Sequence, residues 1–315
     1  MRTTLSADDF AEILSHYDLG EHQGFEKFAT GAGQTTVLLF TTSGKYVLRY
    51  YENRTEKHVR FEVNLINHLW KHGYPVPAII KNSANDFYDT YQDKPYIMIE
   101  YVEGEHPHNP NDCFDEAQAS QVVEVVARLH TLTQNYHPAY LKDREEFDAV
   151  YCSREYKKRT RTKDKEARET WLARELGELE FPADLPRGIC HADLNHGNFL
   201  FRNGKIAAVF DFDMSFYTFV IYDLASLLYW WALPPKGGFN AERASFIVRQ
   251  YSQDRVLSES EKKHIYDALK LIILLGISWS EEGDFEQSEK SIGHLTALGR
   301  DRFYNALFGG KKSVC

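Results

Sequence analysis

A short polar segment in the second half of the chain holds the side chains best suited to metal-dependent chemistry. It reads H-A-D-L-N-H-G-N from His191 to Asn198, and D-F-D follows at Asp211. Between them, Asn203-Gly204 is flanked by two apolar runs, a pattern typical of a β-hairpin. Because the two strands of a hairpin lie side by side, Asn198 and Asp211 at its two ends are predicted to meet.

A carboxylate and an amide oxygen that meet form a site for a hard cation. Mg²⁺ is usually held by few protein ligands together with water and substrate phosphates, which suits Asn198 and Asp211. Asp193 precedes Asn198 on the same loop, so it is predicted to lie near the metal and to accept the proton of a hydroxyl group. Asp213 would face the same way as Asp211 in an extended segment, where it is either a second-metal ligand or a solvated acid.

The first hundred residues are predicted to form a small sheet with one helix. Strands are indicated by β-branched and aromatic residues at 34–40, 45–51, 87–91 and 96–102. The turn Thr-Thr-Ser-Gly joins the first two of them in a hairpin. Thr55 can cap a helix that continues to about His72, where Gly73 and the Pro-Val-Pro that follows end it.

Two charged residues of this part are expected to point inward. Arg49 alternates along its strand with residues of the opposite face, and it shares a face with Val47 and Tyr51. Glu62 lies on the apolar face of the predicted helix, where a buried carboxylate needs a cation. We predict an ion pair between Arg49 and Glu62. The alternative is a surface arginine and an exposed glutamate.

After Gly104 the pattern changes from strands to helices. Helical spacing of apolar residues is found at 115–132, 163–179, 223–231, 242–251 and 258–280. The sequence therefore predicts a two-lobed α+β protein, with a small antiparallel-sheet lobe at 1–102 and a larger, mainly helical lobe at 103–315. The basic run K-K-R-T-R-T-K-D-K from Lys157 is predicted to be a solvated helix face, because acids flank it.

Composition excludes several classes of protein. Of the 315 residues, 43% are hydrophobic and 14% aromatic, which is enough to build folded cores. The net charge of −9 disfavours nucleic acid as a partner. The uncharged apolar stretch from Leu271 to Trp279 is far shorter than the roughly 20 residues that cross a bilayer. Since the N-terminus also lacks a signal peptide and the cysteines are scattered, we expect a cytoplasmic protein with free thiols and no membrane partner.

The polar segment resembles that of the aminoglycoside phosphotransferase family, small-molecule kinases that include choline, methylthioribose and type II homoserine kinases. The shared features are H-A-D-L-x-x-x-N, then D-F-D at Asp211, then Y-D-L-A at Tyr222, and the resemblance covers nearly the whole chain. It implies a protein-kinase-like fold and ATP-dependent phosphorylation of a small-molecule hydroxyl. It also implies Asp193 as catalytic base and Mg²⁺ ligands at Asn198 and Asp211, with Asp213 as a further candidate.

The resemblance also implies supporting residues. His191 is expected to brace the loop and not to carry a proton, because Asp193 already serves as the base. Asp223 can cap the helix that follows it, and the resemblance implies that it also steadies the loop by accepting backbone hydrogen bonds. The residues implied to bind ATP are the loop glycines Gly31 and Gly33, the pair Arg49 and Glu62, and the hinge residues Glu100 and Val102. Arg49 stands where protein kinases have lysine, as it does in other small-molecule kinases.

Looser similarities connect the chain with type II homoserine kinases. They are Y-D-L-G at Tyr17, G-K-Y-V-L at Gly44, Y-E-N-R at Tyr51, and Tyr251 followed by R-V-L-S-E-S-E. The loop A-G-Q-T from Ala32 departs from that group, as does Asp213. The predicted acceptor is therefore homoserine or a related amino alcohol, with an aminoglycoside or a choline-type or ethanolamine-type alcohol as the alternative.

Two other classes of protein use the same residue types. A nucleotide-binding pseudokinase would bind ATP without turnover, but the intact Asp193, Asn198 and Asp211 argue against it. A two-carboxylate hydrolase would use Asp211 and Asp213 and would need no nucleotide. We expect a kinase that acts on a small molecule as a monomer or homodimer.

Overall fold

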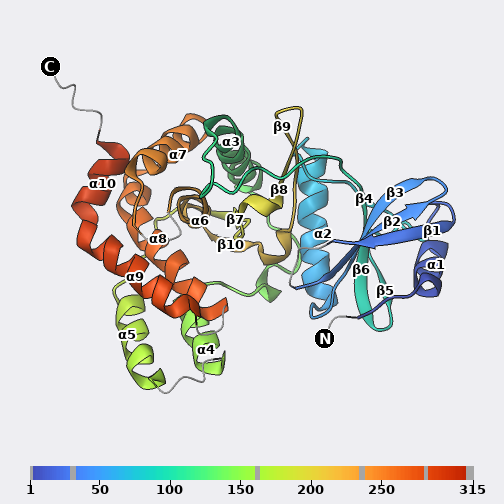
Figure 1. Cartoon of the computed structure of the whole chain (residues 1–315), viewed down its shortest axis with the longest axis horizontal. Helices are drawn as coiled ribbons and strands as arrows, with labels where there is room; N and C mark the ends of the chain where they lie inside the picture. Colours follow the sequence, from blue (N-terminus) through green and yellow to red (C-terminus); the bar gives the residue numbers. More distant parts are fainter. Residues whose placement is uncertain (1–2, 29–32, 160–163, 234–237, 280–282, 310–315) are drawn as a thin grey trace. The chain divides into compact units, whose positions relative to one another are not determined.

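The computed structural model describes residues 3–28, 33–159, 164–233, 238–279 and 283–309. The chain divides into two compact units, and Figure 1 shows the elements of each in sequence colours. Unit 1 comprises Met1–Glu105, His137–Arg144 and Leu200–Asp213, and unit 2 comprises His106–Tyr136, Glu145–Phe199 and Met214–Cys315. The lobes expected at 1–102 and 103–315 stay a prediction.

Unit 1 is built on a six-stranded antiparallel sheet in the order β1-β2-β3-β6-β4, with β5 paired to β6. The strands are β1 (His22–Lys27), β2 (Thr35–Thr41), β3 (Gly44–Tyr50), β4 (Ile79–Ile80), β5 (Asp89–Tyr91) and β6 (Lys94–Glu100). The hairpin predicted from the β-branched runs is β2–β3, in a register that pairs Thr36 with Arg49. The strand β1 was not predicted.

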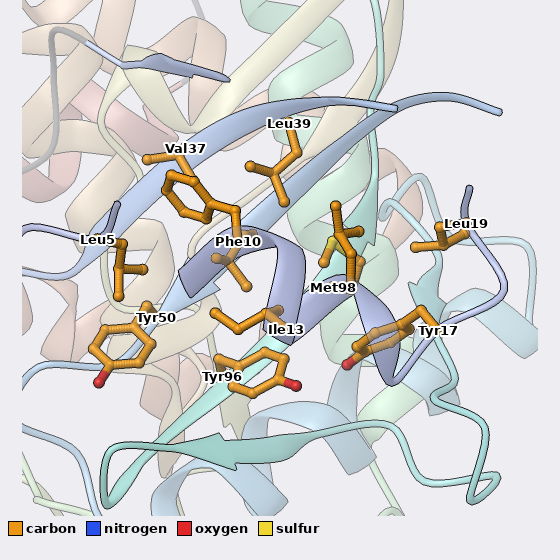
Figure 2. Packing of buried hydrophobic residues seen from close by; sticks show 12 residues of the cluster. Leu5, Phe10, Ile13, Tyr17, Leu19, Val37, Leu39, Tyr50, Tyr96 and Met98 are labelled. Atoms are coloured by element: carbon orange, nitrogen blue, oxygen red, sulfur yellow. The ribbon is translucent and has the colours of Figure 1, made fainter. Parts of the chain in front are cut away.

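The two faces of this sheet have different roles. Helix α1 (Ala7–Ser15) packs on the face that carries Val37, Leu39 and Tyr50, where Phe10 and Ile13 complete an apolar cluster (Figure 2). Arg49 alternates with Tyr50 along β3, so its side chain projects from the opposite face. That face lies against helix α2 (Glu56–Lys71), which contacts β4 and β6. The sheet thus has an apolar side and a side that carries charge.

The hairpin predicted after the catalytic loop is present as β8 (Phe199–Arg202) and β9 (Lys205–Val209). Its turn residues Asn203 and Gly204 have φ angles of 54° and 73°. Positive φ at both positions matches the right-handed twist of a tight hairpin, which is why Asn-Gly serves here. After β9 the chain enters a 3₁₀ turn (Phe212–Met214) instead of continuing as an extended segment.

Unit 2 is mainly helical, with one small sheet in which β7 (Arg187–Cys190) pairs antiparallel with β10 (Phe216–Phe219). Its helices are α3 (Glu116–Thr133), α4 (Ala149–Arg159), α5 (Lys165–Gly177), α6 (Ile221–Ala232), α7 (Ala241–Asp254), α8 (Glu259–Trp279), α9 (Gly283–Leu298) and α10 (Arg300–Phe308). Helix α6 lies against α7 and α8, while α3 packs on α7 and β7. Helix α3 thus packs directly on the strand that leads into the loop beginning at His191.

Two further expectations concern charge and hydrophobicity along the chain. Lys157 and Lys158 are exposed in the last turn of α4, and Lys165 begins α5, so the basic run spans two helices and not one helix face. The predicted helix start at Lys163 lies outside the described residues. Within the described ranges, no helix is both long and apolar enough to span a bilayer.

Candidate active site

In unit 2, the loop after β7 holds Asp193 half-buried and oriented by two neutral amides. Asn195 Nδ2 donates to Asp193 Oδ1 at 2.8 Å, and Asn198 Nδ2 donates to Asp193 Oδ2 at 3.0 Å. The same Asn198 nitrogen also donates to the Asp193 carbonyl oxygen at 2.8 Å. Each carboxylate oxygen keeps a further lone pair, so this arrangement fixes the direction of the group and leaves it able to accept another proton donor.

Asp223 fixes the backbone immediately before Asp193. This fully buried carboxylate accepts from the backbone N–H of His191 at 2.7 Å and from that of Ala192 at 2.9 Å. Ala192 has a φ of 69°, a conformation that non-glycine residues rarely adopt. The alternative that Asp223 caps the helix is wrong, because α6 begins before it, with Val220 as N-cap.

His130 and Tyr251 extend this network and were not predicted. His130 is completely buried, with Nε2 at 3.1 Å from Asp223 Oδ2 and Nδ1 at 2.6 Å from the Tyr251 hydroxyl. Since Nε2 faces a carboxylate, it carries the proton, and Nδ1 then accepts from Tyr251. One feature of the sequence indicates this contact. His130 lies on the buried side of α3, where a polar side chain needs a hydrogen-bond partner.

In unit 1, Arg49 contacts two carboxylates. Its Nε lies 4.0 Å from Glu62 Oε1, which is the predicted ion pair, and its Nη2 lies 2.6 Å from Asp211 Oδ1. The surface-arginine alternative is wrong, because the side chain of Arg49 is only 13% exposed and that of Glu62 only 3%. Burial raises the pKa of Glu62 to about 7, against the opposing effect of the arginine charge. The shorter contact to Asp211 was not anticipated.

Asp213 is an anchored acid and not a solvated one. Arg54 donates to both of its oxygens, each at 2.7 Å, and Gln34 Nε2 lies 3.3 Å from Oδ2. Arg144 also donates to the Asp213 backbone carbonyl. Burial alone would raise the pKa of Asp213, but the hydrogen bonds and charge of Arg54 and the charge of Arg49 lower it to about 2. The 3₁₀ turn at 212–214, in place of the expected extended segment, explains why Asp213 does not follow Asp211.

The donor atoms available for a divalent cation differ among the three candidate ligands. Asn198 uses Nδ2 to contact Asp193, which leaves Oδ1 as an oxygen donor. Asp211 is 39% exposed and uses Oδ1 for Arg49, so Oδ2 is a second oxygen donor. Both fit a hard cation, whereas the oxygens of Asp213 are already engaged by Arg54. Asn198 and Asp211 belong to different units, and their approach stays a prediction.

The other positions expected to contact ATP lie in unit 1. Gly33 is exposed, and a Cβ there would meet nothing within 4 Å. Gly31 lies outside the described residues. Glu100 ends β6 and donates its backbone N–H to the Ala78 carbonyl at 3.0 Å, and Val102 follows two positions later, half-buried. Gly33 is consistent with a loop, and Glu100 and Val102 are consistent with a hinge. The structure assigns no ligand to either place.

Residues 24–255 match the profile of the phosphotransferase enzyme family. The chain belongs to this family. Among its curated relatives, the homoserine kinase of Bradyrhizobium diazoefficiens is 30% identical over 270 residues, which cover 82% of this chain and 79% of that protein. The homoserine kinase of Rhodopseudomonas palustris strain BisB5 gives the same identity and the same coverage.

Solved structures confirm the predicted protein-kinase-like α+β fold of this phosphotransferase. A microcompartment-associated aminopropanol kinase has a TM-score of 0.70 at 17% identity, covering 96% of this chain and 99% of the other. An amicoumacin kinase in complex with AMP-PNP, Ca²⁺ and its ligand has a TM-score of 0.68 at 20% identity, covering 93% and 95%. With the family membership, the relatives make the chain an ATP-dependent kinase of a small-molecule hydroxyl.

Proposed function

We propose that this phosphotransferase transfers the γ-phosphoryl group of Mg²⁺-bound ATP to the side-chain hydroxyl of homoserine or a closely related amino alcohol. The similarity to homoserine kinases across 82% of the chain carries the choice of acceptor. The orientation of Asp193 by Asn195 and Asn198 supports the chemistry, because a hydroxyl acceptor needs a carboxylate held in place with a free lone pair.

In this proposal, Asp193 is the catalytic base. Phosphoryl transfer has a loose transition state, so most of the catalysis is positioning and charge stabilisation. Asp193 orients the acceptor hydroxyl and takes its proton, while Asp223 and His191 hold the loop in shape. The two amide donors on Asp193 suit this task, since they restrict its rotation without adding a positive charge that would weaken it as a base.

The remaining residues hold the nucleotide and the metal. Asn198 Oδ1 and Asp211 would hold Mg²⁺, whose charge would neutralise the phosphates, and Arg49, anchored by Glu62, would contact the phosphates. We infer that Arg49 exchanges its bond to Asp211 for the nucleotide phosphates, because phosphate and carboxylate offer the guanidinium similar acceptors. The remaining proposed ATP contacts are Gly31 and Gly33 in the loop and the backbone of Glu100 and Val102 in the hinge. Asp213, held by Arg54, anchors this segment and is not assigned to the metal.

The acceptor is tested by ADP release in a coupled assay. We expect the kcat/KM for homoserine to exceed that for aminopropanol, choline, ethanolamine, methylthioribose and a set of aminoglycosides by about tenfold or more, since a built site discriminates against acceptors that leave its polar groups unpaired. Mass spectrometry then identifies O-phosphohomoserine as the product. Turnover of another alcohol while homoserine gives only the acceptor-free background would contradict the choice of homoserine but not the kinase reaction.

Removing the Arg49 guanidinium tests the proposed phosphate contact. Arg49→Ala is expected to raise the KM for ATP by about tenfold or more and to lower kcat, because a charge-assisted hydrogen bond to phosphate is lost. Arg49→Lys should restore only part of the ATP affinity, since lysine keeps the charge but not the planar fork. Arg202→Ala, at an exposed arginine of the β8–β9 hairpin, is the control. Unchanged nucleotide kinetics in Arg49→Ala would exclude the phosphate contact.

A further inference from the structure

Unit 2 contains a cavity of about 410 Å³ that plays no part in the proposed site. It is formed by the C-terminal end of α3, the start of β7 and the C-terminal end of α7. Neither Asp193 nor Asn198 contributes to its lining. Its volume falls within the range of small-molecule sites, which are typically about 300–1,000 Å³. The cavity is therefore large enough for a ligand of its own.

The charge of the cavity is positive. Its lining includes Arg187 and Arg255 but, within the described part of the chain, no aspartate or glutamate. Arg255 has a structural role, because its Nη1 lies 2.7 Å from Glu261 Oε1 and it follows the end of α7, where the helix dipole favours a cation. Arg187 is exposed and has no carboxylate partner among the described residues; its guanidinium lies 5.9 Å from the ring centroid of Tyr217. Arg187 therefore supplies a positive charge that has no carboxylate partner in the part of the chain that the structure describes.

Neutral hydrogen-bonding groups surround this charge. Thr131, Gln134 and Asn135 from the end of α3 line the cavity, and all three are exposed. Their hydroxyl and amide groups both donate and accept hydrogen bonds, which suits the polar substituents of a small organic molecule. A guanidinium beside such groups is suited to a carboxylate or phosphate, which it binds through two parallel hydrogen bonds.

The cavity is also connected to the catalytic loop. His130 forms part of its wall and contacts Asp223 at 3.1 Å. Asp223 in turn accepts from the backbone N–H groups of His191 and Ala192, directly before Asp193. Two buried side chains thus stand between the cavity and the backbone of the loop. The His130 side chain is completely buried, so a ligand would act on it only through the last turn of α3, which carries His130 and lines the cavity.

We propose that this cavity binds a small anion, a phosphate or a carboxylate, through Arg187, and that the bound anion stabilises the catalytic loop through His130 and Asp223. The importance of this loop for turnover rests on the proposed role of Asp193, whereas binding of the anion and its effect on the loop do not. Both parts are therefore measured without any acceptor, so that failure of the homoserine assay leaves the test unaffected.

Binding is measured by the ³¹P line width of inorganic phosphate, with Mg²⁺ and AMP-PNP saturating the nucleotide site. Line broadening is expected for the unchanged protein and for Arg302→Gln, a matched loss of charge at an exposed arginine of α10. Arg187→Gln should weaken phosphate binding by about tenfold or more. Displacement of phosphate by acetate, but not by chloride at equal ionic strength, would show that the site also accepts carboxylates, and the ratio of the two dissociation constants gives the preferred class. Equal broadening in Arg187→Gln, or none in the unchanged protein, would overturn the site.

Coupling to the loop is measured by hydrogen exchange of the peptide that spans residues 190–194. Phosphate is expected to slow exchange of the His191 and Ala192 amides in the unchanged protein and in Arg302→Gln, but not in Arg187→Gln, because the hydrogen bonds to Asp223 would open less often. If phosphate binds through Arg187 and exchange of this peptide stays the same, the coupling is wrong and the cavity is an isolated anion site.

Discussion

Asp211→Ala is expected to lower turnover by roughly 10³-fold or more, even at saturating Mg²⁺ and ATP. The substitution removes the carboxylate proposed to hold the metal, and metal stabilisation of transition-state charge amounts to several kcal/mol, each 1.36 kcal/mol being tenfold in rate. Of the two carboxylates that contact Arg49, the substitution removes Asp211 and keeps Glu62. The buried arginine therefore retains a counter-charge, and we expect the variant to fold.

The measurement is steady-state ADP release across a Mg²⁺ titration, with thermal unfolding to confirm that the variant is folded. Asp86→Ala is the matched control, because Asp86 is exposed and belongs to the same unit. Its turnover should equal that of the unchanged protein. Retention of most activity by Asp211→Ala at saturating Mg²⁺ would remove this residue from the metal site.

Asp193→Asn is expected to slow turnover by roughly 10² to 10⁴-fold, the range typical of a lost general base. ATP affinity should change little, because the residue is proposed to face the acceptor and not the nucleotide. The substitution also disturbs the loop, since both oxygens of Asp193 accept from amide nitrogens and an asparagine offers only one acceptor. A control is needed that removes a hydrogen bond and keeps the carboxylate.

Asn195→Ala provides this control. It deletes the donor to Asp193 Oδ1 and the acceptor for the Gly197 N–H, but it leaves the base in place. We expect a loss of at most about tenfold, because Asn198 still holds the carboxylate through its other oxygen. The loss of turnover in Asp193→Asn beyond that in Asn195→Ala then reports the proton transfer. The ATP affinity of each variant is measured separately by equilibrium titration. Loss of ATP binding with turnover close to normal would make Asp193 a scaffold residue.

The parts of the fold that could be predicted are those with strong local signals. The alternation of residues along β2 and β3 and the Asn203-Gly204 turn are local patterns, and both hairpins are present. The inward direction of Arg49 and Glu62 also follows from strand and helix periodicity. Helix α4, in contrast, was not predicted: a glutamate stands among its few buried residues and cations follow them, so its sequence holds little apolar signal.

The parts that could not be predicted depend on contacts between distant segments. Arg49 and Asp211 are 162 positions apart, and Arg54 and Asp213 are 159 apart, so no local spacing indicates either pair. The prediction for Asp213 assumed an extended segment after Asp211, whereas the chain forms a 3₁₀ turn there and Asp213 pairs with Arg54. Such pairs become visible only when the packing of the unit is known.

The backbone conformation and burial of Ala192 restrict which residues can take its place in this loop. Its φ of 69° favours glycine, asparagine or aspartate over other residues, and its 6% exposure leaves space only for a small side chain. A β-branched residue here would have to pull its N–H away from Asp223. A larger side chain at position 192 is thus expected to weaken the hydrogen bonds between Asp223 and this loop as well as to crowd its surroundings.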